Sequence, residues 1–288
     1  MAQYRLFADA ACDIPENMLN EWGVSMIDMT FRFEGEEEQF NGDVPAPAFY
    51  QKMRNGACSR TAAINSETFQ ETFRPVLEAG EDLVYLAFSS GLSTTYEQAV
   101  MTARSLKEEY AGRKILVADS LAASGGYGLL VYLAAKKKQE GATIEELVRY
   151  IEETRLSVCH WFTVDDLVYL KRGGRVSPTL ALVGTVLGIK PVLHVDNEGH
   201  LISMSKARSR KRSLKALADA FATSAIDPAS GPVFISHGDC EEDAKVLAEM
   251  VKEASGGREI DLMTFIGPVI GSHSGPGTMA LFFLGKQR

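Results

Sequence analysis

The segment with the clearest chemical potential covers residues 88–96. It reads FSSGLSTTY and carries six side-chain hydroxyl groups in nine residues. An apolar run typical of a strand precedes it over residues 83–88, and a helical pattern follows over residues 96–110. A glycine turn between a strand and a helix N-terminus directs backbone N–H groups and hydroxyls at one point, where an anion is stabilised. The candidate ligands for such a phosphate or carboxylate are Ser89, Ser90 and Ser93.

A structural role for these hydroxyls is the alternative, since Ser and Thr are common helix N-caps. One hydroxyl is enough for capping, and six exceed that need, so both interpretations stay open. A nucleotide phosphate loop is excluded, because the segment lacks the pattern G-x-x-x-x-G-K-[ST] and has no lysine in the turn. The glycines at residues 125–128 resemble a nucleotide loop only loosely, and close helix packing explains them better.

Two further segments offer polar groups to an anion. His273 stands between two serines in residues 267–277, GPVIGSHSGPG, where four glycines and two prolines predict a loop of fixed geometry and little bulk. An imidazole there is either a structural group or a hydrogen-bond donor to an anion. Thr61 precedes a helix that Asn65 or Ser66 would cap, which leaves the threonine hydroxyl free; taken alone, this signal is weak.

A basic segment at residues 206–212, KARSRKR, contrasts with the rest of the chain, whose formal net charge is −8. It is either a solvated surface or a docking patch for an acidic partner or a phosphorylated ligand. DNA binding would use the same cations, but the net charge argues against a nucleic-acid partner, and no DNA-binding fold signature accompanies the segment.

Composition sets the broad class of protein. The 288 residues are 45% hydrophobic and 24% charged, which is typical of a soluble globular chain. Four scattered cysteines without a C-x-x-C pair, and the absence of a dense Asp, Glu and His cluster, predict neither a metal site nor disulfides. We expect a cytoplasmic protein, because the N-terminus lacks an apolar signal core and the longest apolar stretch is too short to span a bilayer.

The elements that position these residues alternate between strands and helices in the first half, which predicts a mainly parallel sheet with crossover helices. Ligands collect at the carboxyl ends of such strands, where Asp9, Ser89, Ser90, Asp119 and Ser120 stand. We expect strands over residues 4–8, 83–88 and 115–118, and helices over residues 15–22, 66–79, 96–110 and 124–139.

The pattern changes after a helix that Thr143 caps. A turn at residues 172–175, a short apolar helix over residues 180–187 and a strand pair around residues 196–199 follow, and then further helices and strands. The sequence therefore predicts an N-terminal α/β domain over residues 1–157, mainly a parallel sheet with flanking helices. A mixed α/β domain is expected over residues 158–288.

Seven segments, in order, resemble blocks of the DegV family. Residues 9–15, DAACDIP, are similar to D-S-x-x-D-[IL]-P with Ala10 in place of the serine. Residues 60–65, RTAAIN, resemble T-S-x-x-N with Ala62 in place of the serine, and residues 89–96 are close to S-S-G-L-S-G-T-Y. The other blocks are residues 118–120, 172–175, 236–239 and 267–277.

The resemblance implies two α/β domains with an extended acyl chain between them, because DegV proteins bind fatty acids. It implies that Thr61, Ser93 and His273 hold the carboxylate and that Arg172 lies near the pocket. The changes at Ala10 and Ala62 remove hydrogen bonds that would support these residues. In bacteria that take up fatty acids, such proteins serve as the binding subunit of fatty acid kinase. That partner is expected at a basic surface, for which the candidates are Arg208, Arg210, Lys211 and Arg212.

The sequence thus predicts a carrier rather than an enzyme, which binds a long-chain fatty acid such as palmitate, stearate or oleate. It would present the carboxylate to the kinase without a cofactor or metal of its own, and with at most transient contact with a membrane surface. The alternative is an acyl hydrolase that uses Ser93 and His273. It lacks the G-x-S-x-G elbow and an evident acid beside the histidine. A DNA-binding regulator acting through residues 206–212 is the third hypothesis.

Overall fold

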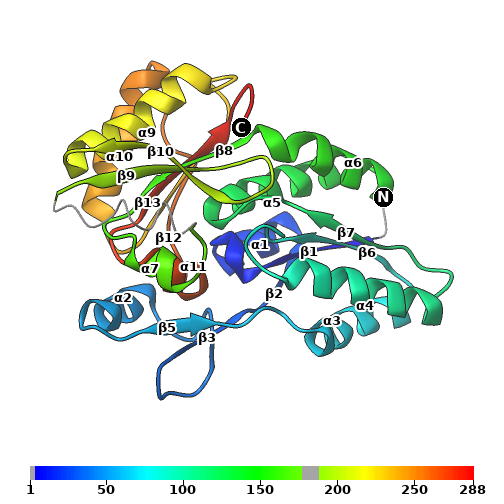
Figure 1. The fold of residues 1–288 in the computed structure, drawn as a ribbon. Helices are drawn as coiled ribbons and strands as arrows, with labels where there is room; N and C mark the ends of the chain where they lie inside the picture. The colour runs from blue at the N-terminus through cyan, green and yellow to red at the C-terminus, as the bar shows by residue number, and fades with distance from the viewer. Residues whose placement is uncertain (1–3, 177–187) are drawn as a thin grey trace.

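The computed structural model describes residues 4–176 and 188–288 (Figure 1). The short apolar helix expected over residues 180–187 lies outside these residues. Three sheets organise the described chain: one parallel, one mixed and one small and antiparallel. The expected α/β fold, with a parallel sheet in the first half and a mixed sheet in the second, is confirmed.

The first sheet has the order β2-β1-β6-β7, and all its neighbouring strands run parallel. Parallel pairing requires crossover connections, which the helices supply. Two of the predicted helix caps are present: Asn65 accepts a hydrogen bond from Thr68 N, and Thr143 forms a capping box with Glu146. The strands are β1 (Tyr4–Asp9), β2 (Val24–Ile27), β6 (Asp82–Ala87) and β7 (Ile115–Asp119); the helices are η1 (Ala10–Cys12), α1 (Glu16–Trp22), α3 (Ser66–Glu78), α4 (Thr95–Glu109), α5 (Ser124–Gln139), α6 (Ile144–Thr154) and η2 (Arg155–Ser157).

The second sheet has the order β10-β9-β8-β13-β11-β12, in which only β11 and β12 pair in parallel. The expected strand pair around residues 196–199 is the hairpin of β9 and β10. The strands are β8 (Val158–Thr163), β9 (Lys190–Val195), β10 (Leu201–Ala207), β11 (Val233–His237), β12 (Leu262–Phe265) and β13 (Met279–Leu284); the helices are α7 (Val168–Arg172), α9 (Arg210–Ser224), α10 (Glu241–Ser255) and α11 (Pro268–Ser274).

Helix α5 lies between the two larger sheets and is buried along most of its length (Figure 1). Its glycines allow this close approach. A Cβ at Gly125 would lie 2.9 Å from Phe282, and one at Gly126 would lie 2.7 Å from the same ring. The packing explanation of the glycines at residues 125–128 is therefore confirmed.

A third sheet, with the order β4-β3-β5, comes from the first half of the chain but packs against the second half. Phe31, Phe49 and Tyr50 form a small core with Ile266, and the Tyr50 hydroxyl donates a 2.9 Å hydrogen bond to the Ile266 carbonyl. The division of the chain into domains at residue 157 remains a prediction. The elements are β3 (Thr30–Phe33), β4 (Gln39–Phe40), α2 (Ala46–Arg54) and β5 (Ser59–Thr61).

The prediction of a loop over residues 267–277 is wrong for its central part, which forms helix α11. Pro268 occupies the first helical turn, where a proline needs no N–H partner. Gly271 lets the helix approach α2, since a Cβ there would lie 2.6 Å from the Tyr50 hydroxyl oxygen. The glycines and the proline therefore serve helix packing as well as the turn that follows.

Candidate functional site

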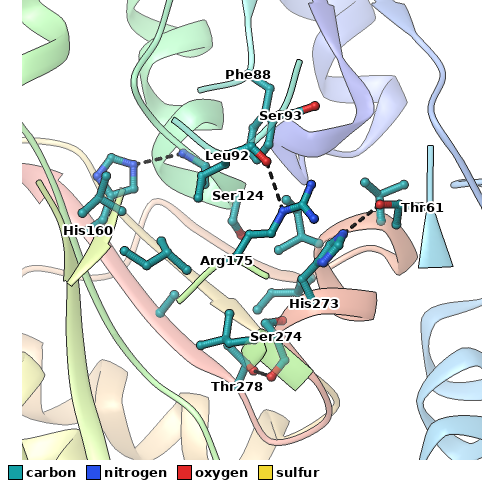
Figure 2. Close-up of a pocket in the computed structure, with 18 of the residues that line it drawn as sticks. Thr61, Phe88, Leu92, Ser93, Ser124, His160, Arg175, His273, Ser274 and Thr278 are labelled. Atoms are coloured by element: carbon teal, nitrogen blue, oxygen red, sulfur yellow. Dashed lines mark hydrogen bonds between the residues drawn. The ribbon is translucent and has the colours of Figure 1, made fainter. Parts of the chain in front are cut away.

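An inner cavity of about 360 Å³ lies between the two larger sheets and receives residues from both halves of the chain (Figure 2). Apolar side chains dominate its lining, and polar groups gather mainly where β5, the turn after β6 and α11 meet. This combination suits a ligand with a long apolar part and a polar end. The lining residues include Met29, Thr61, Phe88, Ser90, Leu92, Ser93, Phe162, Leu170, Arg175, Leu201, Val269, Ile270, His273, Ser274 and Phe282.

Thr61 and His273 form the most distinctive polar pair of the cavity. They are 212 positions apart in the sequence, yet Oγ1 of Thr61 lies 2.7 Å from Nε2 of His273. Burial, followed by the charge of Arg175, lowers the pKa of His273 to about 4, so the imidazole is neutral near pH 7. Nδ1 of His273 has no hydrogen-bond partner among the described residues. The pair therefore offers one neutral donor to a ligand oxygen, which is the Thr61 hydroxyl if Nε2–H donates to it, or Nδ1–H if the hydroxyl donates to Nε2.

Ser93 lies in the cavity lining at the start of α4. Its Oγ is 2.9 Å from the Thr95 hydroxyl and accepts a 3.2 Å hydrogen bond from Thr95 N. This local arrangement at a helix N-terminus fixes the serine side chain. Ser93 thus lines the same cavity as Thr61 and His273. That the three hold a carboxylate stays a prediction.

Ser89 and Ser90 have other bonding partners. Ser89 is fully buried outside the cavity lining, and its Oγ donates a 3.0 Å hydrogen bond to the carbonyl of Gly199 in the β9–β10 turn. Ser90 lines the cavity, but its hydroxyl donates to Asp119 Oδ2 at 2.5 Å. The first serine secures the hairpin and the second secures the end of β7.

Arg175 was not singled out for the site, although it closes the R-G-G-R block. Its Nε donates a 3.1 Å hydrogen bond to the Leu92 carbonyl, and it also donates to the Gly173 carbonyl. Burial lowers its pKa, but a guanidinium keeps its charge at neutral pH. In Figure 2 its side chain lies beside His273. The R-G-G-R block at residues 172–175 was the only sequence signal for this second arginine.

Arg172 lies outside the inner cavity and lines an adjoining outer cavity of about 470 Å³. The two cavities share Thr61, Arg175 and His273, so these three residues stand between them. The outer cavity is more polar and receives Glu34, Cys58, Ser59, Arg60, Tyr169, Arg172, Gly173 and Ser272 in addition.

Asp13 links the inner cavity to helix α11. Its Oδ2 accepts a 2.6 Å hydrogen bond from the Ser124 hydroxyl, and its Oδ1 accepts a 2.8 Å bond from Gly267 N. Burial raises the pKa of this carboxyl to about 7. The family-like segment at residues 9–15 therefore supports the element that carries His273.

The described residues do not form the serine–histidine–acid triad that an acyl hydrolase would need. Oγ of Ser93 bonds to Thr95, and Nε2 of His273 bonds to Thr61. No carboxylate lies within hydrogen-bond distance of His273 in this part of the chain. A serine nucleophile requires a bonded base and an orienting acid, and this geometry supplies neither.

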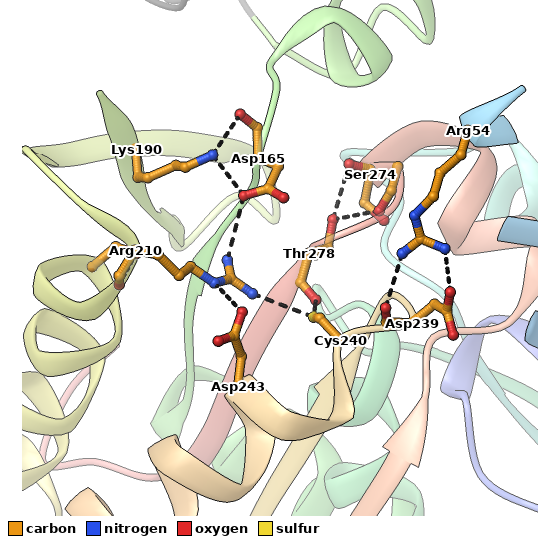
Figure 3. Close-up of polar contacts among 11 residues, drawn as sticks. Arg54, Asp165, Lys190, Arg210, Asp239, Cys240, Asp243, Ser274 and Thr278 are labelled. Carbon is orange, nitrogen blue, oxygen red and sulfur yellow. Dashed lines mark hydrogen bonds and ion pairs between the residues drawn. The ribbon is translucent and has the colours of Figure 1, made fainter. Parts of the chain in front are cut away.

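The basic segment divides into two kinds of residue. Arg208, Lys211 and Arg212 are exposed at the start of α9, whereas Arg210 turns inward. The Arg210 Nε lies 2.8 Å from Asp243 Oδ2, and a second nitrogen lies 3.3 Å from Cys240 Sγ (Figure 3). Three of the four proposed docking cations are thus exposed, and the fourth holds α9 to α10.

The described parts of the chain hold neither a cluster of metal-binding side chains nor a membrane-spanning helix. Residues 4–176 and 188–288 contain no group of three or more His, Cys, Asp or Glu side chains able to hold a metal. Within the same ranges, every helix is too short or too polar to cross a bilayer.

Comparison with known proteins agrees with the geometry. A family profile described as "Uncharacterised protein, DegV family" matches residues 3–286. A DegV domain-containing protein of Clostridium perfringens is 40% identical over 290 residues, covering 100% of this chain and 99% of the relative.

Two solved structures are similar over nearly their whole length. A DegV family protein from Thermus thermophilus, described by its fatty acid binding, is 26% identical with a TM-score of 0.86, covering 98% of this chain and 99% of that one. A DegV lipid binding protein from Thermotoga maritima is 26% identical with a TM-score of 0.85, covering 100% of both chains. Since the profile, the relative and the fold agree over nearly all of the sequence, this chain belongs to the DegV family.

Proposed function

We propose that this protein binds a long-chain fatty acid, such as palmitate, stearate or oleate, with the acyl chain in the inner cavity. Thr61, Ser93 and His273 would hold the carboxylate. The observation that carries the proposal is the meeting of a mostly apolar cavity with the neutral Thr61–His273 pair. The fatty acid binding described for the Thermus relative supports it.

The two ends of the ligand would contribute differently to binding. Burial of about 15 methylenes stabilises the complex by about 12 kcal/mol before ordering costs, at about 0.8 kcal/mol each. Hydrogen bonds to a charged carboxylate contribute about 1.5–3 kcal/mol apiece. The tail therefore supplies most of the affinity, and the hydroxyls and imidazole set the position of the head group.

The protein would act as a carrier that presents the carboxylate to a fatty acid kinase, which forms the acyl phosphate. Neutral donors leave a carboxylate oxygen more nucleophilic than a tight ion pair would. The exposed cations Arg208, Lys211 and Arg212 would dock the acidic kinase surface, and Arg210 would support them through its bond to Asp243. The carrier would need no cofactor of its own, and it would act in the cytoplasm, where the partner kinase has ATP.

The binding step is tested with delipidated protein and a fluorescent fatty acid. We expect Ser93→Ala to weaken binding about tenfold through loss of one charge-assisted bond. Ser90→Ala is the matched control, because its hydroxyl bonds to Asp119, and it should change affinity less than about twofold. Equal losses in both variants would contradict the assignment of Ser93.

The carrier step is tested by mixing the loaded protein with purified fatty acid kinase and ATP. Acyl phosphate, trapped with hydroxylamine and identified by mass spectrometry, is the expected product. Fatty acid binding without acyl phosphate would refute the carrier role and keep the lipid-binding role. Turnover of an ester substrate that depends on Ser93 would revive the hydrolase alternative.

A further inference from the structure

The inner cavity carries a second group of polar side chains, apart from the Thr61–His273 pair. Ser274, at the end of α11, and Thr278, just before β13, both line the cavity. Figure 2 shows them at an intermediate position between the pair and His160. An acyl chain that extends from a carboxylate at the pair toward His160 would therefore pass Ser274 and Thr278 part-way along its length.

The Ser274 hydroxyl has no hydrogen-bond partner within residues 4–176 and 188–288, although only 6% of the residue is exposed. An unpaired buried hydroxyl is costly, because it has given up its hydrogen bonds to water. Other lining residues, such as Val269, Ile270 and Phe282, are apolar and offer it no polar side-chain atom. A saturated acyl chain would leave this hydroxyl unpaired as well, whereas an oxygen atom on the chain would pair with it.

The hydrogen-bonding capacity of these two side chains favours a hydroxyl group over a carbonyl group on the ligand. Oγ1 of Thr278 lies 2.9 Å from the Ser274 carbonyl oxygen and 2.8 Å from the Gly275 carbonyl oxygen, so its proton is directed at the backbone (Figure 3). The lone pairs of Oγ1 remain, and they can only accept, whereas Oγ of Ser274 can donate or accept. A ligand hydroxyl can accept from Ser274 and donate to Thr278, but a carbonyl oxygen can only accept.

We propose that the preferred ligand is a fatty acid with a hydroxyl group part-way along its chain, which Ser274 and Thr278 bind. This inference rests on the proposed function, since the same cavity holds the carboxylate and the chain. Without such a subsite a hydroxy fatty acid binds less tightly than the plain one, because its buried hydroxyl loses its hydrogen bonds to water. The subsite therefore sets specificity, while burial of the apolar chain still supplies most of the affinity.

Displacement of a fluorescent fatty acid by stearate, 3-hydroxystearate, 7-hydroxystearate and 10-hydroxystearate tests the proposal. We expect the 7- or the 10-hydroxy isomer to bind the wild-type protein at least as tightly as stearate. Ser274→Ala should weaken binding of that isomer about tenfold, and should change the affinity for stearate and for 3-hydroxystearate, whose hydroxyl lies beside the carboxylate, less than about twofold. The variant should keep its thermal stability, because the Ser274 hydroxyl forms no hydrogen bond within the described residues.

Ser236→Ala is the matched control. Oγ of Ser236 is also buried and without a partner in the described parts of the chain, but this serine does not line the inner cavity. Removal of this hydroxyl should leave the affinity for each of the four ligands within about twofold of the wild-type value.

The outcomes distinguish this inference from the proposed function. Tight stearate binding, together with hydroxystearate affinities that Ser274→Ala leaves unchanged, overturns the hydroxyl subsite alone. The subsite is also overturned if every hydroxystearate binds the wild-type protein at least about tenfold more weakly than stearate. A wild-type protein that binds neither stearate nor any hydroxystearate overturns the proposed function and the subsite with it.

Discussion

Gly173→Ala is expected to impair ligand binding while leaving the backbone unstrained. Gly173 ends α7 with φ −71° and ψ −11°, a conformation that alanine adopts readily. A Cβ there would lie 3.2 Å from Cγ and 3.3 Å from Cε1 of His273, and still closer to Nδ1. The ring must therefore move by about 1 Å to restore ordinary contact distances.

The His273 ring cannot make this movement along the line that joins its two nitrogen atoms, because both ends are blocked. Thr61 lies 2.7 Å away on the Nε2 side, and the new methyl group would press from the Nδ1 side. The ring must rotate out, which breaks its bond to Thr61 and withdraws a donor from the carboxylate. The two losses amount to about 1 and about 1.5–3 kcal/mol, so fatty acid affinity should fall about 60- to 700-fold.

Gly174→Ala is the matched control. Gly174 has φ +68°, and a Cβ there would meet nothing within 4 Å. Alanine in this left-handed conformation costs about 1–2 kcal/mol of stability and leaves the cavity intact. Displacement of a fluorescent fatty acid and thermal unfolding, measured on both variants, should show loss of affinity in Gly173→Ala and loss of stability in Gly174→Ala. Affinity within twofold of wild type in Gly173→Ala would refute the role given to the histidine.

Three further outcomes are expected. Asp13 has a pKa of about 7 in the folded state and 3.8 in the unfolded chain. The protonated carboxyl therefore stabilises the folded state by on the order of 4 kcal/mol below about pH 4, and this contribution is lost as the pH rises through about 7. Asp13→Asn should therefore flatten the fall in urea stability between about pH 4 and pH 7, and an unchanged slope would contradict this. Gly91→Ala would place a Cβ 2.7 Å from Glu198 O and 2.9 Å from Gly199 O. The variant should therefore lose about 1–3 kcal/mol of stability in thermal unfolding. An unchanged stability would mean that the β9–β10 hairpin moves without cost. Replacing Arg208, Lys211 and Arg212 by Glu should weaken association with the kinase at least about tenfold, measured by surface plasmon resonance, and leave palmitate affinity unchanged. If neither these substitutions nor added salt changes the association, this docking surface is excluded.

Local signals allowed much of the first sheet to be predicted. Its strands are short apolar runs with polar residues at their carboxyl ends, and the caps Asn65 and Thr143 mark two helices within a residue or two. The hairpin of β9 and β10 followed from the turn at residues 196–199 for the same reason. Such features depend on neighbours in the sequence, so the sequence alone reveals them.

The remaining features depend on contacts between distant residues. The small sheet of β3, β4 and β5 was not predicted, because its core forms with Ile266 from the other half. Helix α11 was mistaken for a loop, since its glycines have a packing role that appears only beside Tyr50. From the residues alone, Thr61 was a weak candidate, and its partner lies 212 positions away. Only the resemblance to the DegV family indicated that Thr61 and His273 belong to one site.

The lipid that accompanies the purified protein tests the central claim most directly. The protein is denatured in organic solvent, and the released small molecules are identified by mass spectrometry. The account predicts an intact long-chain fatty acid at close to one molecule per chain, and less of it in the Gly173→Ala variant. Release of a phosphate ester or a nucleotide in its place, or of no lipid after growth with added fatty acid, would contradict the account.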